Sequence, residues 1–185
     1  MSLALDYANQ HREIVEACQS GNRRAQNQLY NLYSKAMYNI CYRMMGNQME
    51  AEDVLQNSFI DVFTKLHTFR FQSSVGAWIK RIVINNCINQ IKKRKLTFEL
   101  LDDRYDFAEN HPPEKPQADL SVEQIKQAMA NLSDGYRVVF SLYLLEGYDH
   151  KEIASILKIS EATSKSQFSR AKAKMRMLLE KQDVV

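Results

Sequence analysis

Basic side chains and asparagines gather in one stretch near the middle of the chain, and aromatic residues come just before it. Residues 80–95 hold six Lys or Arg, no Asp or Glu, and three asparagines, and residues 69–78 include Phe69, Phe71 and Trp78. Cations of this kind neutralise phosphates, aromatic rings stack on unpaired bases, and amides hydrogen-bond to base edges. The pattern is typical of contact with single-stranded nucleic acid. An ordinary helix with a core Trp and a solvated Lys-rich end is the alternative.

A second basic stretch lies near the carboxyl end, where residues 151–185 hold eight Lys or Arg against four Asp or Glu. One face of a helix there carries Ser164, Phe168, Ala171, Met175 and Leu178, spaced by three and four residues. The opposite face carries Lys165, Ser166, Gln167, Ser169, Arg170 and Lys172, with Thr163 in the first turn. Gln can bond adenine, Arg or Lys can bond guanine, and hydroxyls serve bases or phosphates, so this face suits the major groove of DNA.

The residues before this helix predict a helix-turn-helix. Asp149 is a good N-cap, and Glu152, three residues on, completes a capping box. Lys158 and Ile159 form the turn, and Ser160 caps the second helix. A turn of this type usually has Gly where this chain has Lys158, which costs on the order of 1 kcal/mol if that residue is left-handed. A plain helical hairpin with a solvated basic face is the alternative.

The amino-terminal half must position the first basic stretch, and its apolar spacing predicts helices. After a short helix that ends near Gly21, a long one is capped by Asn22, ends at Gly46, and is predicted to bury Ala25, Leu29, Leu32, Ala36, Ile40 and Met44. The next is predicted to bury Ala51, Val54, Leu55, Ser58, Phe59, Val62, Phe63 and Leu66, and its other face carries Asp53, Gln56, Asn57 and Asp61. A fourth helix is predicted from about residue 75 to 95.

Composition and charge divide the chain into two helical domains. With 5 Gly and 3 Pro in 185 residues, turn formers are scarce, which favours an all-α fold over a many-stranded one. All three prolines lie between residues 96 and 120, and residues 96–123 hold eight Asp or Glu against two Lys or Arg. We therefore predict one domain over residues 8–95, an acidic linker over 96–120, and a second domain over 121–181. In the second domain, helical stripes are predicted at Val122, Ile125, Met129 and Leu132, and at Tyr136, Val139, Phe140, Tyr143 and Leu144.

Several classes of chemistry lack the residues they need. The three cysteines form no CxxC pair and make no cluster with the four histidines, so we predict no metal site and interpret the cysteines as small buried residues. There is no phosphate-binding GxxxxGK[ST] motif and no catalytic carboxylate or His/Cys constellation, so we predict neither a cofactor nor an enzyme. The amino terminus has no signal-peptide pattern, and no apolar stretch is long enough to span a bilayer, which favours a cytoplasmic protein without membrane insertion.

Three segments taken in order resemble a known family. They are AEDVLQNSFIDVF, then FRFQSSVGAWIKRIVINNCINQIKKRK, then LSDGYRVVFSLYLLEGYDHKEIASILKISEATSKSQFSRAKAKMR after the acidic linker. This combination resembles the bacterial RNA polymerase sigma factors of the extracytoplasmic-function (ECF) class, which keep sigma regions two and four of the sigma-70 family. The resemblance covers about residues 10–95 and 120–180. It implies a protein that directs promoter-specific initiation with core RNA polymerase and promoter DNA as partners, and an anti-sigma factor as a further one.

The resemblance also implies a role for each matching residue. Core polymerase is contacted by Asp53, Gln56, Asn57 and Asp61. The minus-10 element is read and melted by Phe69, Arg70, Phe71, Gln72, Ser73, Lys80, Arg81, Asn85, Asn86 and Asn89. The minus-35 element is read by Thr163, Lys165, Ser166, Gln167, Ser169, Arg170 and Lys172. Asn57 departs from the acidic residue that the family often has, Gln167 stands where several members have Arg, and Trp78 is interpreted as a core residue more than a base contact.

Two interpretations of the linker and three of the whole chain stay open. The linker is either a neutral tether or, as the resemblance implies, a segment that runs near the RNA exit path and mimics nucleic acid. Instead of a sigma factor, the chain could be a two-domain helix-turn-helix regulator that acts without polymerase, or a helical adaptor with no DNA role. Binding to sigma-free core polymerase distinguishes the first interpretation from the other two.

Overall fold

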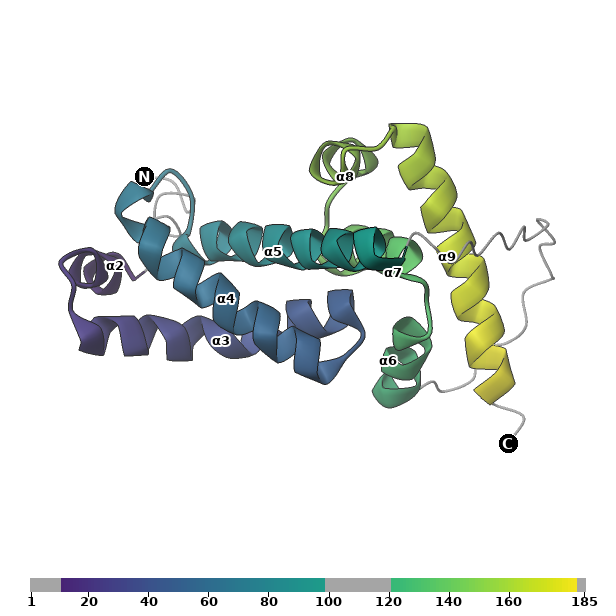
Figure 1. The fold of residues 1–185 in the computed structure, drawn as a ribbon, viewed down its shortest axis with the longest axis horizontal. Coiled ribbons are helices and arrows are strands. Elements are labelled where there is room, and N and C mark those ends of the chain that lie inside the picture. The colour runs from purple at the N-terminus through teal and green to yellow at the C-terminus, as the bar shows by residue number, and fades with distance from the viewer. Residues whose placement is uncertain (1–10, 99–120, 183–185) are drawn as a thin grey trace, which may run out of the picture. The chain divides into compact units, whose positions relative to one another are not determined.

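In the computed structural model, which describes residues 11–98 and 121–182, all regular structure is helical (Figure 1). This confirms the all-α prediction. The chain divides into two compact units, one made of Met1–Tyr42 and Gln48–Gln90, the other of Arg43–Asn47 and Ile91–Val185. The predicted domain boundaries stay predictions. The helix predicted to end at residue 95 continues to Phe98, and the rest of the predicted linker lies outside the described residues.

Over residues 11–98, the first unit is built on four α-helices and one short 3-10 helix. They are α2 (Arg12–Gln19), α3 (Arg23–Met45), α4 (Gln48–Lys65), η1 (Leu66–Thr68) and α5 (Val75–Phe98), and the last three residues of α3 and the end of α5 belong to the second unit. Asn22 caps α3 as predicted, since its Oδ1 accepts from the backbone N–H of Arg24 at 2.9 Å. Gly46, with φ +69°, ends α3 in the left-handed conformation that glycine adopts without strain.

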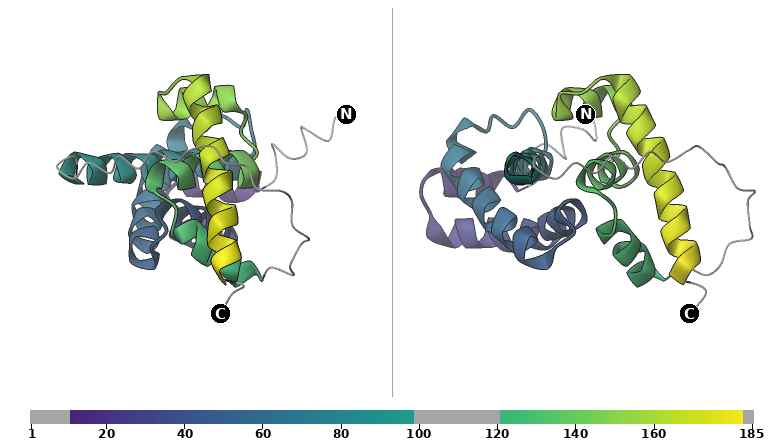
Figure 2. Two further views of the ribbon diagram at one scale, coloured as in Figure 1. Left: turned by 90° about the vertical axis from the view of Figure 1, so that its right-hand side faces the viewer. Right: turned by 45° about the vertical axis from the view of Figure 1, so that its right-hand side comes forward.

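The core of the first unit lies between α3, α4 and α5 (Figure 1, Figure 2). Its fully buried side chains include Leu29, Cys41, Ala51, Val62, Ile79, Val83 and Cys87. The predicted buried stripe of α4 is confirmed, except that Phe63 is half-buried and that buried Leu66 lies in η1. The stripe predicted for α3 is partly wrong, because Leu32 is 48% exposed and Ala36 is exposed, whereas Met37 and Cys41 are buried. Two neighbouring apolar stripes on α3 both fit the 3.6-residue period, so the sequence alone does not distinguish them. The packing of α4 and α5 against α3 decides which stripe is buried.

The second unit contains the helix-turn-helix. Its described elements are α6 (Val122–Ala130), α7 (Asp134–Phe140), a π-helical turn η2 (Ser141–Leu145), α8 (His150–Leu157) and α9 (Glu161–Gln182). Ala128, Met129, Leu132 and Met175 form a buried cluster that joins α6 to α9. In Figure 2, α9 lies along α6 and α7 and reaches α8 at its amino-terminal end.

Four apolar residues of this unit that were predicted to lie on buried stripes are exposed. Val122 (69% exposed) and Ile125 (37% exposed) lie in the first turn of α6, before Ala128 and Met129, which make its buried contact with α9. Leu144 is turned outward because α7 continues as a π-turn, in which the N–H of Glu146 donates to the carbonyl of Ser141, five residues back, whereas Tyr143, 37% exposed, packs one side of its ring on His150. A 3.6-residue period does not predict this change of register.

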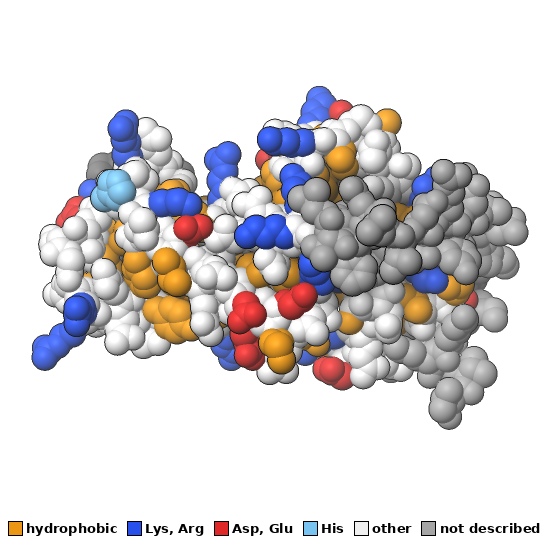
Figure 3. All heavy atoms as spheres, in the orientation of Figure 1, with side chains coloured by type: hydrophobic (Ala, Val, Ile, Leu, Met, Phe, Trp, Pro, Cys, Tyr) orange, Lys and Arg blue, Asp and Glu red, His pale blue; other side chains and the backbone are white. Residues whose placement is uncertain are grey.

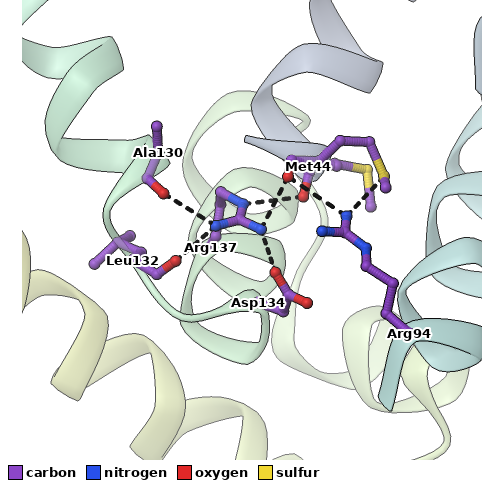
Figure 4. Close-up of polar contacts among 7 residues, drawn as sticks. Met44, Arg94, Ala130, Leu132, Asp134 and Arg137 are labelled. Carbon is purple, nitrogen blue, oxygen red and sulfur yellow. Dashed lines mark hydrogen bonds and ion pairs between the residues drawn. The ribbon is translucent and has the colours of Figure 1, made fainter. Parts of the chain in front are cut away.

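A buried arginine organises the amino-terminal end of α7. The guanidinium of Arg137, 4% exposed, donates to the carbonyl oxygens of Met44 (3.1 Å), Met45 (3.1 Å), Leu132 (2.6 Å) and Ala130 (3.3 Å), and pairs with Asp134 (Figure 4). All these residues belong to the second unit. A buried charge needs partners of this number to offset its lost hydration. The guanidinium of Arg137 also needs a residue without a side chain beside it. Gly46 meets this need, since a Cβ on Gly46 would lie only 2.9 Å from Arg137 Cζ.

Candidate nucleic-acid interface

The helix-turn-helix is fixed by three local devices that were predicted from sequence. Asp149 accepts from the N–H of Glu152 at 2.8 Å, and the carboxylate of Glu152 accepts from the N–H of Asp149 at 2.8 Å, which completes the capping box of α8. Lys158 takes the left-handed conformation (φ 58°, ψ 48°) at the turn. Ser160 caps α9, because its Oγ accepts from the N–H of Thr163 at 3.0 Å. These contacts set the directions in which α8 and α9 leave the turn.

The inner side of α9 packs on α8 through a mixed apolar and polar contact. Ser164 is fully buried, and its Oγ lies 2.9 Å from Nδ1 of His150 at the start of α8. The His150 ring stacks on Tyr143, with ring centroids 4.5 Å apart, and Phe168 contacts both rings. Sequence reasoning missed His150 and the position of Tyr143, since a histidine in the first turn of a helix has no periodic signal.

The outer side of α9 presents most of the residues predicted to read the minus-35 element. Lys165, Ser166, Arg170 and Lys172 are exposed, and Thr163, Gln167 and Ser169 are half-buried. The Gln167 amide lies beside the backbone of α7, because a Cβ on Gly135 would be 3.8 Å from its Nε2. Lys165 pairs with Glu161 at 2.7 Å and thereby lowers the pKa of that carboxyl. Such exposed pairs exchange readily for phosphate contacts because they contribute little to stability.

The loop between η1 and α5 is built on aromatic contacts within the first unit. Phe69, only 6% exposed, packs against Phe71 and Trp78, with ring centroids 5.0 and 5.3 Å away. The half-buried place of Trp78 agrees with its interpretation as a packing residue. Ser74 closes the loop, since its Oγ accepts from the N–H of Ala77 at 3.2 Å. Between these anchors Arg70, Gln72 and Ser73 are exposed and Phe71 is half-buried, so the Phe71 ring is more open than the Phe69 ring.

The polar residues of α5 fall into two groups. Arg81, Asn85 and Asn89 are exposed and spaced by four residues, so they form one line along the helix, with half-buried Lys80 beside it. Asn86 instead donates from Nδ2 to Asp61 Oδ2 at 3.0 Å and to Ser58 Oγ at 3.2 Å, both on α4. The side chains of Arg81, Asn85 and Asn89 are exposed to solvent, whereas the amide of Asn86 ties α5 to α4.

Asp61 is therefore tied to α5 rather than presented freely with the other predicted docking residues. The hydrogen bond from Asn86, together with Lys65 at 3.2 Å, holds the pKa of the Asp61 carboxyl below its ordinary value. Asp53, Gln56 and Asn57 are exposed on the outer face of α4. Figure 3 shows acidic side chains gathered over the amino-terminal half of this helix.

An exposed apolar residue extends that face of α4. Ile60 is 64% exposed and follows Gln56 and Asn57 by four and three residues, which puts it on the same side of the helix. Sequence reasoning assigned Ile60 to no face. The sequence could have indicated this exposed apolar residue, because Ile60 falls outside the buried stripe of α4, at a position where the exposed face of a helix ordinarily carries a polar residue.

The cysteines behave as the sequence predicted. Cys18, Cys41 and Cys87 are free and buried, and a hydrogen bond with the neighbouring Cys41 thiol, together with burial, raises the pKa of Cys87. Among the described residues, no group of three His, Cys, Asp or Glu is arranged to hold a metal ion. In the same part of the chain, no helix combines the length and the apolar character that crossing a membrane requires.

Comparison with known proteins agrees with this arrangement. The family models Sigma-70 region 2 and Sigma-70, region 4 match residues 29–97 and 122–175. The ECF RNA polymerase sigma factor SigW of Bacillus subtilis is 28% identical over 179 residues, which cover 91% of this chain and 96% of SigW. SigM of the same organism is 27% identical over 152 residues, which cover 82% of this chain and 93% of SigM.

A solved structure shares the fold. The sigma factor RpoE from Bartonella quintana, in complex with the anti-sigma factor NepR, matches with a TM-score of 0.56 and 24% identity, over 83% of this chain and 96% of that one. The chain belongs to the sigma-70 family, in the ECF class of RNA polymerase sigma factors. Sigma factors are non-enzymatic DNA-recognition subunits of RNA polymerase, and the chain has a sigma-factor role in transcription initiation.

Proposed function

We propose that the chain binds core RNA polymerase through the outer face of α4 and directs promoter-specific initiation. In this proposal α9 reads the minus-35 element in the major groove. The loop Phe69–Ser74 and the exposed line on α5 then capture unpaired bases of the minus-10 element and promote strand opening.

The capped, basic helix α9 is the observation that carries the proposal. Lys165, Arg170 and Lys172 are exposed on a helix whose first turn is fixed by Ser160 and whose inner side is anchored by buried Ser164. A recognition helix needs this combination, because side chains reach base edges only when the helix axis is held at a set angle. Gln167, which is half-buried beside Gly135, supports contact at the edge of the interface rather than at its centre.

The minus-10 part of the proposal is supported by exposure and residue type in the first unit. Arg70, Gln72 and Ser73 are exposed in the loop, and Arg81 precedes Asn85 and Asn89 on one line of α5. Capture of unpaired bases by such amides, and by the more open ring of Phe71, offsets an unstacking cost of a few kcal/mol per base. Phosphate contacts by the cations add affinity that falls as salt rises.

Docking on polymerase is supported by the outer face of α4. Asp53, Gln56 and Asn57 are exposed there, and Ile60 adds an apolar side chain to a polar surface. Interfaces combine an apolar centre with a polar rim in this way. We assign Ile60 to this docking surface, and Asp61 to its edge, because the Asp61 carboxylate is already hydrogen-bonded to Asn86.

We also propose an anti-sigma factor as a partner and the cytoplasm as the place of action. The similar RpoE structure contains an anti-sigma factor. Exposed Val122 and Ile125 on α6 give the second unit an apolar surface of the type that protein partners cover. Residues 99–120 of the acidic linker lie outside the described residues, and the passage of the linker near the RNA exit path stays part of the proposal.

Two binding measurements on matched variants test the division of labour. Asp53→Ala is expected to weaken binding to sigma-free core polymerase, measured by anisotropy of the labelled chain, and to leave binding to a minus-35 duplex unchanged. Arg170→Ala is expected to do the reverse. Glu13→Ala, which removes an exposed acid from α2, is the control for charge. Equal effects of Asp53→Ala and Arg170→Ala on core binding would contradict the assignment.

A further inference from the structure

The helix that precedes the matched family regions contacts the loop predicted to capture minus-10 bases. Gln19, the last residue of α2, donates from Nε2 to the carbonyl oxygens of Leu66 at 2.9 Å and of Phe69 at 3.4 Å. Leu66 is the first residue of η1 and Phe69 follows its last, and the Leu66 carbonyl also accepts from the backbone N–H of Phe69 at 3.0 Å. Gln19 therefore ties α2 to both ends of η1 and fixes the point at which the loop begins.

A second residue of α2 contacts the middle of the loop. Arg12 Cζ lies 4.0 Å from the centre of the Phe71 ring, within the range of a cation–π interaction, and Arg12 pairs with Glu16 at 3.3 Å. Arg12 and Gln19 are seven residues apart, which puts them on the same side of α2. One face of this helix thus holds the loop at two points.

The contact at Phe71 acts on a strained residue. Phe71 has φ +55°, a left-handed conformation that is rare for a bulky side chain and persists only where the surroundings hold it. Phe69 contacts the Phe71 ring at 5.0 Å between centroids, and Arg12 lies over the ring. Because Phe69 is itself placed by Gln19 through its carbonyl oxygen, both contacts depend on α2.

We propose that Arg12 and Gln19 are positioning residues that hold the minus-10 loop in the shape that captures unpaired promoter bases. The inference rests on the proposed function, in which this loop contacts the minus-10 element. A loop already held in its bound shape loses less conformational freedom on binding, so the two contacts strengthen base capture without touching DNA. The match to the region 2 family model begins at residue 29, so α2 lies outside it.

The test separates base capture from folding and from docking. Holoenzyme is assembled from core polymerase and the full chain, and its affinity is measured for a minus-10 non-template oligonucleotide and for the closed duplex promoter. Gln19→Leu removes the donor without adding charge, and Gln19→Glu removes it at nearly constant size. Each variant is expected to weaken oligonucleotide binding about tenfold and to lower opening of the duplex, followed by 2-aminopurine fluorescence, by the same factor, which equals about 1.4 kcal/mol.

Arg12 variants test the second contact. Arg12→Gln is expected to weaken oligonucleotide binding several-fold, and Arg12→Lys to restore part of the loss, since a lysine can still place a cation over the ring. Gln28→Glu and Arg24→Gln make matched changes at exposed positions of α3 and are expected to bind as the wild type does.

Three outcomes overturn the inference or its basis. Oligonucleotide binding by Gln19→Leu within twofold of the wild type contradicts the positioning role. A loss that appears equally in core binding and closed-promoter binding shows a general folding defect instead, and also contradicts it. Failure of the wild-type holoenzyme to bind the oligonucleotide or open the promoter contradicts the proposed function itself.

Discussion

The side-chain amide of Asn86 donates to the carboxylate of Asp61 at 3.0 Å, and this bond joins α5 to α4. The two residues were predicted to serve different surfaces, one for DNA and one for polymerase. In the structure each restrains the other, and Asn86 also donates to Ser58, which is fully buried. The pair thus fixes the angle between the helix that carries the docking residues and the helix that carries the DNA residues.

Asn86→Ala is expected to act on stability more than on recognition. Loss of its two hydrogen bonds should lower the free energy of unfolding by about 1 kcal/mol, measured by urea denaturation. Asn85→Ala and Asn89→Ala, whose side chains are exposed, should leave stability within about 0.5 kcal/mol of the wild type and weaken minus-10 oligonucleotide binding. The opposite distribution of effects would show that Asn86 contacts DNA directly.

The lowered pKa of Asp61 predicts a pH dependence on the acid side. The folded state favours the ionised carboxylate, so its contribution to stability is present above the ordinary aspartate pKa of 3.8 and is lost as the pH falls through the lower folded value. Because Asp61 is about one-third exposed, the contribution is a few tenths of a kcal/mol. Below about pH 5, the free energy of unfolding of Asp61→Asn should therefore fall less steeply with falling pH than that of the wild type. An unchanged curve would contradict the ionised pair.

The Arg137 cluster predicts a large loss of stability in the second unit. Arg137→Met leaves the buried carbonyls of Met44 and Leu132 without this donor and Asp134 without its ion-pair partner, and should cost about 3 kcal/mol. Arg176→Met, at an exposed position of α9, is the matched control and should change stability by less than about 0.5 kcal/mol. Thermal unfolding followed by circular dichroism gives both values.

A substitution at Gly46 tests the packing around the Arg137 guanidinium. Gly46→Ala adds a Cβ within 2.9 Å of Arg137 Cζ at a residue with φ +69°, so it should lower stability by at least about 1 kcal/mol. Gly21→Ala is the control, because Gly21 has φ +81° and no atom lies within 4 Å of the added Cβ. Its loss of stability therefore measures the backbone strain without a steric contact. Equal losses in the two variants would mean that the approach to Arg137 contributes nothing.

The exposed residues of α9 should separate sequence readout from phosphate contact. Arg170→Ala is expected to reduce discrimination between bases at one minus-35 position by about 1–3 kcal/mol. Lys172→Ala should instead weaken binding to all DNA sequences alike and lower the slope of log affinity against log salt concentration by about 1. Gln167→Ala should alter base preference less than Arg170→Ala, because Gln167 is half-buried beside Gly135. Binding to a set of single-base minus-35 variants at several salt concentrations measures all three.

Local chemistry was predictable from the sequence wherever one or two neighbouring residues decide it. The caps at Asn22, Asp149 and Ser160 and the turn at Lys158 depend on side chains within three residues of the backbone they bond, and all were confirmed. Helical periodicity likewise predicted the buried stripe of α4.

Contacts between distant segments were not predictable in this way. Gln19 bonds to residues 47 and 50 positions away, and no spacing rule connects α2 to the loop. Asn85 and Asn86 are adjacent and chemically identical, so only the packing of α5 on α4 decides that one is exposed and the other bonded. Arg137 has the sequence character of an exposed cation, and its burial depends on carbonyl oxygens of α3.

The sigma-factor role depends on one experiment, transcription from a promoter pool by sigma-free core polymerase with and without the purified chain. We expect specific transcripts only when the chain is present, from DNA fragments that share elements near minus-10 and minus-35. Specific retention of DNA fragments by the chain alone, with neither core binding nor transcripts, would contradict it and would identify a regulator that acts without polymerase.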